Sequence, residues 1–502
     1  MDSHFTIESN PPPVLAGAPI NHEVLEFMGP EANHEAGVPM LSLERALNLA
    51  VKQSRAYQSA KEQVYLSALA LSLARHQFTP IFSGSDNTEY AELHDQVPSL
   101  NGRHVSSDGT LGVSWLLRDI GKVTAAATTD FLRYISGDPR SVISSQLGAT
   151  FTRPLLRDAN YQSEMETLTQ AERNLLYALR TFVLYRKDFS VQIATTYYTV
   201  LGERDAIRNS FLNLQSSRKA TERGRALAEE GRTTQSDLGR LEQQVLSAEA
   251  TWISAVRTYK SALDSFKIQL GLPVATRLLL DDRELADLKI LHPKINVEDC
   301  IRIALAARLD YQTTCDQSAD AERKVRVAAN QLQMQFDLVA GASMNSGSHG
   351  GFVTPKPSLY QWDVGANINL PFDRKLERNN YRAALITLDQ TKRAQSLLAD
   401  QIAQQVRDDY RALELAKRTF EISEIGVSLA ARRVEEQDLL AELGRAKAQD
   451  QVDAQNDFIN SKNQRTQALV SHTTARLQFW ENLGILFIKD DGQWQEINEV
   501  KP

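Results

Sequence analysis

The residues of this chain that could carry chemistry form no catalytic pattern. No signature of a zinc protease, a phosphate-binding loop, a hydrolase nucleophile or a thiol redox pair occurs in the sequence. The nine histidines are scattered, and His349 lies in the run SGSHGG, which is typical of a loop between strands. The sequence therefore predicts no enzyme, and it offers no ligand set for a metal or a cofactor.

The remaining candidates are carboxylates that follow two glycines. Asp450 and Asp453 come six and nine positions after Gly444, and Asp237 comes six after Gly231. Because Asp450 and Asp453 are three positions apart, they would share one face of a helix. A plainer interpretation is that Asp450 only stabilises the first turn of an ordinary helix through the helix dipole.

Bulk composition narrows the class of protein. The chain has 502 residues, of which 42% are hydrophobic, and its mean hydropathy is -0.36, which is typical of a water-soluble surface. No stretch approaches the apolar length of a transmembrane helix, which leaves a soluble protein or membrane strands, whose signal is weaker. The net charge of -7, without a run of five or more like charges, disfavours a nucleic-acid partner. Cys300 and Cys315 would lie roughly 22 Å apart on one helix, too far for a disulfide.

The elements that would position the acids occur twice. The segment LERALNLAVKQSRAYQ from Leu43 matches VEDCIRIALAARLDYQ from Val297 at a constant shift of 254 positions. A second segment, GRTTQSDLGRLEQQV from Gly231, matches GRAKAQDQVDAQNDF from Gly444 at a shift of 213, without a gap over 40 positions. The sequence therefore predicts an internal tandem duplication.

The two copies are unequal, because the two shifts differ by 41 residues. Pro154 and Pro371 correspond at an intermediate shift of 217, so 37 surplus residues precede Pro154 in a tract rich in Gly, Ser and Asp. We expect the other four surplus residues in the helix that follows Pro154, where they would add about one turn.

Within each copy the hydrophobic period changes from two to about 3.6. Apolar residues alternate with polar ones from Trp362 to Leu370, over about the length that a tilted membrane strand needs. Alternation by itself favours a half-buried strand of a soluble sheet. After Pro154 and Pro371 the period is helical, and no further proline interrupts it before Gly231 or Gly444. Each helix would span about 100 Å, so a rod or a tube is required.

The predicted organisation follows from these patterns. An extension over 1–40, disordered or peripheral, precedes a first repeat over 41–271, a linker over 272–294, a second repeat over 295–485 and a tail over 486–502. The expected elements of the first repeat are a helix over 41–78, strands and loops over 79–156, a long helix over 157–230 and a return helix over 233–271. Those of the second repeat are a helix over 295–333, strands over 335–371, a long helix over 374–443 and a return helix over 446–484.

Taken in this order, the segments resemble the TolC-like outer membrane efflux proteins. The resemblance covers about Leu41 to Ile485, and the linker segment LPVATRLLLDDREL resembles the belt of that family. It is carried by the repeated openings LSLERALNLAVKQS and INVEDCIRIALAAR, the strand ends FTRPLLRD and INLPFDRK, the tips EEGRTTQSDL and ELGRAKAQDQVDAQ, and the endings LGLP and LGI.

The resemblance implies a mainly α protein with β structure that works as a homotrimer. Long antiparallel hairpins would form an α-barrel across the periplasm, and four strands per protomer would enter a shared β-barrel in outer-membrane lipid. The surplus residues would lie on the extracellular side or form an added hairpin. The function implied is a passive exit duct of a tripartite efflux or type I secretion system, with a periplasmic adaptor and an inner-membrane pump as partners.

The resemblance also gives roles to the tip residues. Asp450, Asp453 and Asp237 would line the periplasmic aperture, where a ring of carboxylates attracts cations. Gly231, Arg232, Gly444 and Arg445 would form the helix-tip turns that contact the adaptor. The aromatic and basic partners of the family do not match, since Ala441 and Ala446 stand at their positions, and Arg445 is a candidate substitute latch.

The N-terminal residues motivate an alternative. MDSHFTIESNPPPVLAGAP has no basic segment followed by an apolar one, so no secretory signal is visible. A soluble elongated coiled-coil scaffold or tether is therefore the second hypothesis.

Overall fold

The computed structural model describes residues 19–21, 26–31, 37–93, 102–118, 120–136, 141–291, 293, 296–346, 355–443, 445 and 447–494. The chain divides into two compact units. The first comprises Met1–Glu62, Arg180–Gln312 and Leu397–Pro502, and it is helical apart from one short strand pair. The second comprises Gln63–Leu179 and Thr313–Ser396, and it contains a β-sheet with the helix segments next to it in sequence.

Each expected opening helix is two helices with one extended residue between them. They are α2 (Leu43–Gln53) and α3 (Arg55–His76), then α7 (Val297–Ala307) and α8 (Leu309–Asn330). The break residues Ser54 and Arg308 have ψ angles of 124° and 122°. The predictions of one continuous helix over 41–78 and one over 295–333 were therefore wrong. Neither break contains proline or glycine, so no local signal marked it.

The long helices α4 (Gln162–Glu229) and α9 (Lys375–Glu442) each have 68 residues. Their return helices α5 (Gln235–Gln269) and α10 (Ala448–Asn482) each have 35. The sequence comparison predicted that the four surplus residues would extend the helix after Pro154. That prediction was wrong, because both long helices have the same length. These four residues lie in the link between Pro154 and α4, which contains the short helix η3 (Ala159–Tyr161). Two non-glycine residues of this link have positive φ, Asp158 at 58° and Tyr161 at 54°.

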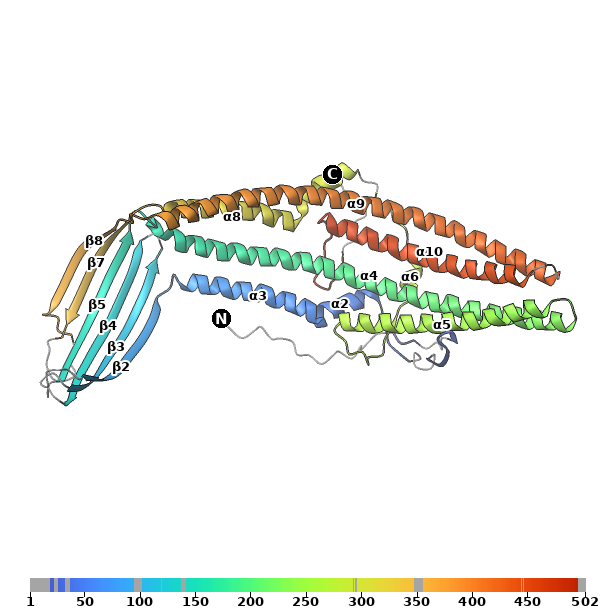
Figure 1. The fold of residues 1–502 in the computed structure, drawn as a ribbon, viewed down its shortest axis with the longest axis horizontal. Helices are drawn as coiled ribbons and strands as arrows, with labels where there is room; N and C mark the ends of the chain where they lie inside the picture. Colours follow the sequence, from blue (N-terminus) through green and yellow to red (C-terminus); the bar gives the residue numbers. More distant parts are fainter. Residues whose placement is uncertain are drawn as a thin grey trace. The chain divides into compact units, whose positions relative to one another are not determined.

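The sheet has six antiparallel strands in the order β2-β3-β4-β5-β7-β8, where four were expected (Figure 1). They are β2 (Ile81–Leu93), β3 (Gly102–Leu117), β4 (Gly121–Ser136), β5 (Ser141–Pro154), β7 (Gln335–Asn345) and β8 (Tyr360–Asn369). At the shifts of 254 and 217, β2 corresponds to β7 and β5 to β8. The hairpin β3–β4 has no counterpart, so the surplus before Pro154 is an added hairpin.

The core of the helical unit is formed by α2 and α7 packed against α4, α5, α9 and α10. Ala46, Ala50 and Tyr197 are fully buried there, together with Phe266 and Cys300. Helices α2 and α7 both begin at a capping side chain. Ser42 accepts a hydrogen bond from the backbone N–H of Arg45, and Asn296 accepts one from the backbone N–H of Glu298. Burial of these apolar faces is what holds such amphipathic helices in place.

Short elements lie on this helical unit. The strands β1 (Met40–Leu41) and β6 (Leu279–Leu280) pair in parallel, followed by α6 (Arg283–Ala286). The extension contributes η1 (Glu26–Glu31), whose Met28 is buried and whose Phe27 carbonyl accepts from the Trp252 indole N–H at 2.8 Å. This part of the extension is therefore an ordered segment that packs on α5. Its residues 1–18 lie outside the described part of the chain.

None of the described helices has the length and apolar character needed to cross a membrane.

Candidate functional site

The six-stranded sheet has one apolar and one polar face. Side chains alternate along a strand, and directly paired residues of neighbouring strands share a face. The pairs Leu111↔Ala127 and Ala149↔Ala342 therefore lie on one face. That face also carries Phe82, Val113, Trp115, Val123, Leu147, Phe151, Ala340, Trp362, Val364 and Ile368. The opposite face carries Ser83, Asn87, Asp108, Thr110, Thr128, Asp130, Gln146, Thr150, Asn345, Gln361, Asp363 and Asn367.

The apolar face is exposed in the single chain. Phe82 is 81% exposed, and Trp362 is 70% exposed. An apolar surface that continues over six strands far exceeds the patches that a soluble monomer usually shows, and it marks a membrane or protein contact. A polar row over four strands, formed by Asp86, Gly109, Thr129 and Ser145, interrupts this face, and Phe131 and Ile143 lie beyond it. Asp86 accepts hydrogen bonds there from Ser107 at 3.0 Å and Thr88 at 3.2 Å.

The first helix tip ends α4 with a glycine cap. Gly231 has a φ of 71°, and the Arg232 N–H donates to the Leu227 carbonyl at 2.8 Å, five residues back. This pattern ends a helix by satisfying its last carbonyl groups. Thr234 then caps α5, since its hydroxyl accepts from the Asp237 N–H at 3.1 Å. The expected tip turn is therefore present at these residues.

The second tip repeats the backbone pattern of the first at the shift of 213. The Arg445 N–H donates to the Leu440 carbonyl at 2.8 Å, as Arg232 does to Leu227. Gly444, the expected cap, and Ala446 lie outside the described residues. Lys447 stands at the N-cap of α10 in place of Thr234, and its side chain makes no capping hydrogen bond.

The three candidate acids have different surroundings. The Thr234 hydroxyl donates to the Asp237 carboxylate at 2.6 Å, so this acid is bound into the cap of α5. Asp453 accepts from the Gln449 amide at 2.9 Å. The exposed carboxylate of Asp450 makes no hydrogen bond or ion pair with any described residue. Asp450 and Asp453 lie on one helix, whereas Asp237 lies on the other hairpin.

Comparison with known proteins decides the fold. No family model and no curated protein matches this sequence. Solved structures do. The CmeC outer membrane channel of Campylobacter jejuni is 13% identical with a TM-score of 0.68, covering 88% of this chain and 85% of that one. VceC of Vibrio cholerae is 14% identical with a TM-score of 0.65, covering 88% and 96%. The open state of Neisseria gonorrhoeae MtrE is 12% identical with a TM-score of 0.64, covering 88% and 89%.

The chain has a TolC-like fold. The resemblance inferred from the sequence is thus confirmed at the level of the fold. At 12 to 14% identity the likeness assigns no role to a side chain, so the acids at the tips remain candidates.

Within the TolC-like fold, polar bonds join the two hairpins of the helical unit. Gln244 of α5 donates to Asn456 of α10 at 2.9 Å, near the tips. Further from the tips, Asn209 of α4 donates to Asn463 of α10 at 2.9 Å. Beside Asn209, the Asp205 carboxylate of α4 accepts from the Thr466 hydroxyl of α10 at 2.8 Å, so amides and a carboxylate together bridge the hairpins.

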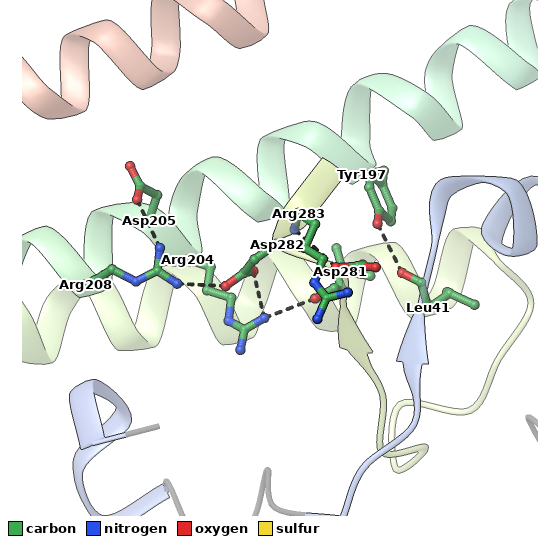
Figure 2. Close-up of polar contacts among 9 residues, drawn as sticks. Leu41, Tyr197, Arg204, Asp205, Arg208, Asp281, Asp282 and Arg283 are labelled. Atoms are coloured by element: carbon green, nitrogen blue, oxygen red, sulfur yellow. Dashed lines mark hydrogen bonds and ion pairs between the residues drawn. The ribbon is translucent and has the colours of Figure 1, made fainter. Parts of the chain in front are cut away.

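An ionic network ties the linker to α4 (Figure 2). The buried Arg204 guanidinium donates to the Leu280 carbonyl at 3.1 Å and to the Asp282 carboxylate at 2.8 Å. Arg208 donates to the second oxygen of Asp282 at 2.8 Å. The Tyr197 hydroxyl donates to the Leu41 carbonyl at 3.1 Å, which fixes the strand beside the linker. Desolvation by burial raises the pKa of Tyr197.

Sequence reasoning found the linker but missed its anchors. Arg204 and Arg208 are four positions apart, so both lie on one face of α4, opposite the acids of DDREL. That spacing was the feature of the sequence from which these anchors could have been predicted. It could not show that one carboxylate, Asp282, receives both guanidinium groups.

Proposed function

We propose that this chain is one protomer of a homotrimeric exit duct that crosses the outer membrane and the periplasm. It would serve a tripartite efflux or type I secretion system. The observation that carries the proposal is the six-stranded sheet of a TolC-like fold, with an apolar and a polar face that both remain exposed. An apolar face suits lipid, and a polar face suits a water-filled lumen.

The edges of the sheet support assembly from several copies. Strands β2 and β8 are the two ends of the strand order, so each has one edge that pairs with no other described strand. In lipid every unpaired backbone group costs several kcal/mol, which excludes an open sheet. Closure with other protomers removes these edges, and the TolC-like fold favours three.

The helix tips would meet the adaptor protein, through which an inner-membrane pump delivers cargo. Leu439 and Leu443 lie one turn apart beside the second tip and are 63% and 66% exposed. Exposed leucines at a polar tip favour contact with another helical protein. Gly231, Arg232, Gly444 and Arg445 are the turn residues proposed for this contact.

The periplasmic aperture is proposed to be lined by Asp450 and Asp453, with Asp237 on the neighbouring hairpin. Three protomers would place six carboxylates of Asp450 and Asp453 around one axis. Such a ring attracts cations and repels anions. Because Asp237 is held by Thr234, its contribution to the ring is expected to be smaller.

Cell fractionation and native mass measurement test the proposal. The expected result is a trimer in the outer-membrane fraction, extracted only by detergent. A monomer or dimer that stays in the soluble fraction would overturn the duct and favour the soluble scaffold.

Replacing Asp450 and Asp453 together by Ala tests the aperture. The cation-to-anion permeability ratio in planar bilayers should fall toward one, and block by multivalent cations should weaken, while the trimer remains intact. Glu435→Ala with Asp438→Ala is the matched control, because these acids are also three apart and exposed on the same hairpin. An unchanged ratio in the aperture variant, or an equal loss in the control, would remove the gate assignment.

A further inference from the structure

We propose that three copies of this chain close an eighteen-stranded barrel, whose wide polar lumen admits bulky hydrophilic cargo. The inference rests on the proposed function, and it departs from the four strands per protomer that the family resemblance implied. Its basis is the added hairpin β3–β4, which is inserted within the sheet.

The register shows the hairpin to be part of the wall. β3 pairs with β2 from Gly102 to Ser114 and with β4 from Arg103 to Leu117. β4 continues the ladder to β5 between Lys122 and Thr152. A hairpin folded over the sheet as a flap would leave β2 and β5 to pair with each other, but here β3 and β4 separate them.

The two faces continue through the hairpin. The pair Leu111↔Ala127 lies on the apolar face and the adjacent pair Thr110↔Thr128 on the polar face. A segment exposed to water on both sides would not need this alternation, because nothing would select apolar side chains on one of them. The hairpin is therefore built for the same two environments as β7 and β8.

Six strands also satisfy the geometry of closure. They are fewer than the eight of the smallest membrane barrels, so one chain cannot close alone. Because the number is even, β2 and β8 run in opposite directions, and β8 of one copy meets β2 of the next as an antiparallel pair.

The strand number sets the width. At a strand spacing near 4.8 Å and a tilt of about 40°, twelve strands give a backbone diameter of about 24 Å and eighteen about 36 Å. Barrels of the larger size leave an aqueous channel after side chains fill part of the lumen. The lumen here would be lined by Asn87, Asp108, Thr110, Asp130, Gln146 and Asp363.

Thiol labelling tests whether the hairpin lies in the wall. Thr110→Cys, Leu111→Cys, Ala127→Cys and Thr128→Cys are made singly with Cys300→Ser and Cys315→Ser, and the trimer in lipid nanodiscs is treated with a membrane-impermeant maleimide. Cysteines at 110 and 128 should react, and those at 111 and 127 should not. Reaction at all four positions would overturn the inference.

Ser343→Cys and Ala342→Cys in β7 are the matched control, because they lie on the polar and the apolar face of a strand outside the hairpin. Alternation in β7 without alternation in the hairpin overturns the wide barrel and leaves the duct standing. A soluble protein without alternation at either place would instead refute the duct itself.

Deletion of Gly102–Ser136 tests the width. After the deletion β2 and β5 still run antiparallel and can pair with each other. Phe82 and Phe151 would then face each other, as the corresponding residues Phe336 and Ile368 do in the second half. The diameter of the largest polyethylene glycol that can enter from the barrel side should fall by about 12 Å. An equal cut-off in both proteins would contradict the inference. If the deletion variant does not assemble, the strand count in electron microscopy of the unaltered trimer decides between eighteen and twelve.

Discussion

At the start of its return helix, the first half of the chain places Thr234 and the second half Lys447. The helices that follow have equal lengths, and both tips use the same backbone hydrogen bond. Only the first tip adds a side-chain cap. Three residues later the Asp237 carboxylate is bound by that cap, whereas the Asp450 carboxylate makes no hydrogen bond with a described residue.

The helix breaks differ in a similar way. Ser54 and Arg308 correspond at the shift of 254, and both have extended backbones. Arg308 donates two hydrogen bonds to Asp310, one to Gln405 and one to the Asn482 carbonyl. No comparable set of side-chain bonds is described at Ser54. The two breaks therefore share an extended backbone, and Arg308 gives the second break charged contacts that Ser54 does not give the first.

The largest effect is expected at the glycines that end the return helices. Gly271 has a φ of 79°, and an added Cβ would lie 2.2 Å from the Gln53 carbonyl oxygen, beside the first break. Gly271→Ala should lower the free energy of unfolding by about 3 kcal/mol or more, because backbone cannot move aside cheaply. The loss of stability is measured by thermal unfolding of the variant and by its resistance to protease digestion.

Two other glycines provide graded controls. Gly484 has a similar φ, but its added Cβ would meet Ala307 and Arg308 at 3.1 to 3.2 Å, so Gly484→Ala should cost less. Gly231 has open space around it, and Gly231→Ala should cost only the left-handed backbone strain of about 1 kcal/mol. Equal losses at all three would mean that close packing at the breaks does not stabilise the fold.

Arg308→Ala should destabilise the protein by about 3 kcal/mol, because it removes the guanidinium group that donates two hydrogen bonds to the half-buried Asp310 carboxylate. Burial by itself would raise the pKa of Asp310, but the hydrogen bonds and charge of Arg308 outweigh it and lower that pKa. Ser54→Ala, the matched change in the first half, should have little effect. Chemical denaturation of both variants compares the two breaks, and equal losses would contradict their different roles.

A pH effect is expected from Glu481, a partly buried carboxyl group of the second half. Burial, reinforced by the charge of Asp188, raises the pKa of Glu481 to about 7, against the opposing charges of Lys187 and Arg308. Asp409 adds a further carboxylate, and the first half has Ile268 at the position of Glu481.

The sign of this effect follows from proton binding. From about pH 4.5 to about 7 the folded protein keeps a proton that the unfolded chain has lost, so stability falls as the pH rises. Glu481→Gln should flatten that decline and raise the melting temperature at pH 8. Glu424→Gln, an exposed acid on α9, is the control. A decline of unchanged size in Glu481→Gln would assign it to other groups.

Much of this architecture could be predicted because it depends on periodicity. The shift of 213 located both tips, and the absence of proline set the extent of the long helices. Other features depend on contacts distant in sequence. The breaks at Ser54 and Arg308 occur where Gly271 and Gly484 approach from another helix, and no local residue marks them. Likewise, the surplus tract gave the length of β3–β4, but only pairing placed that hairpin inside the sheet.

The smallest effect is expected from giving the second tip the cap of the first. Lys447→Thr would let the new hydroxyl accept from the Asp450 N–H, as Thr234 accepts from that of Asp237. The free energy of unfolding should rise by about 1 kcal/mol, and Thr234→Lys should lower it by a similar amount.

The same substitution separates stability from the proposed aperture. In the first tip the capping hydroxyl also donates to the acid's carboxylate, at 2.6 Å. If Asp450 faces the aperture, Lys447→Thr should hold its carboxylate back and reduce cation block, although it also removes a positive charge nearby. Lys447→Ala removes that charge without adding a cap, so the difference between the two variants isolates the hydroxyl. If cations block the Lys447→Thr and Lys447→Ala channels equally, the unbonded carboxylate of Asp450 is not what distinguishes the second tip.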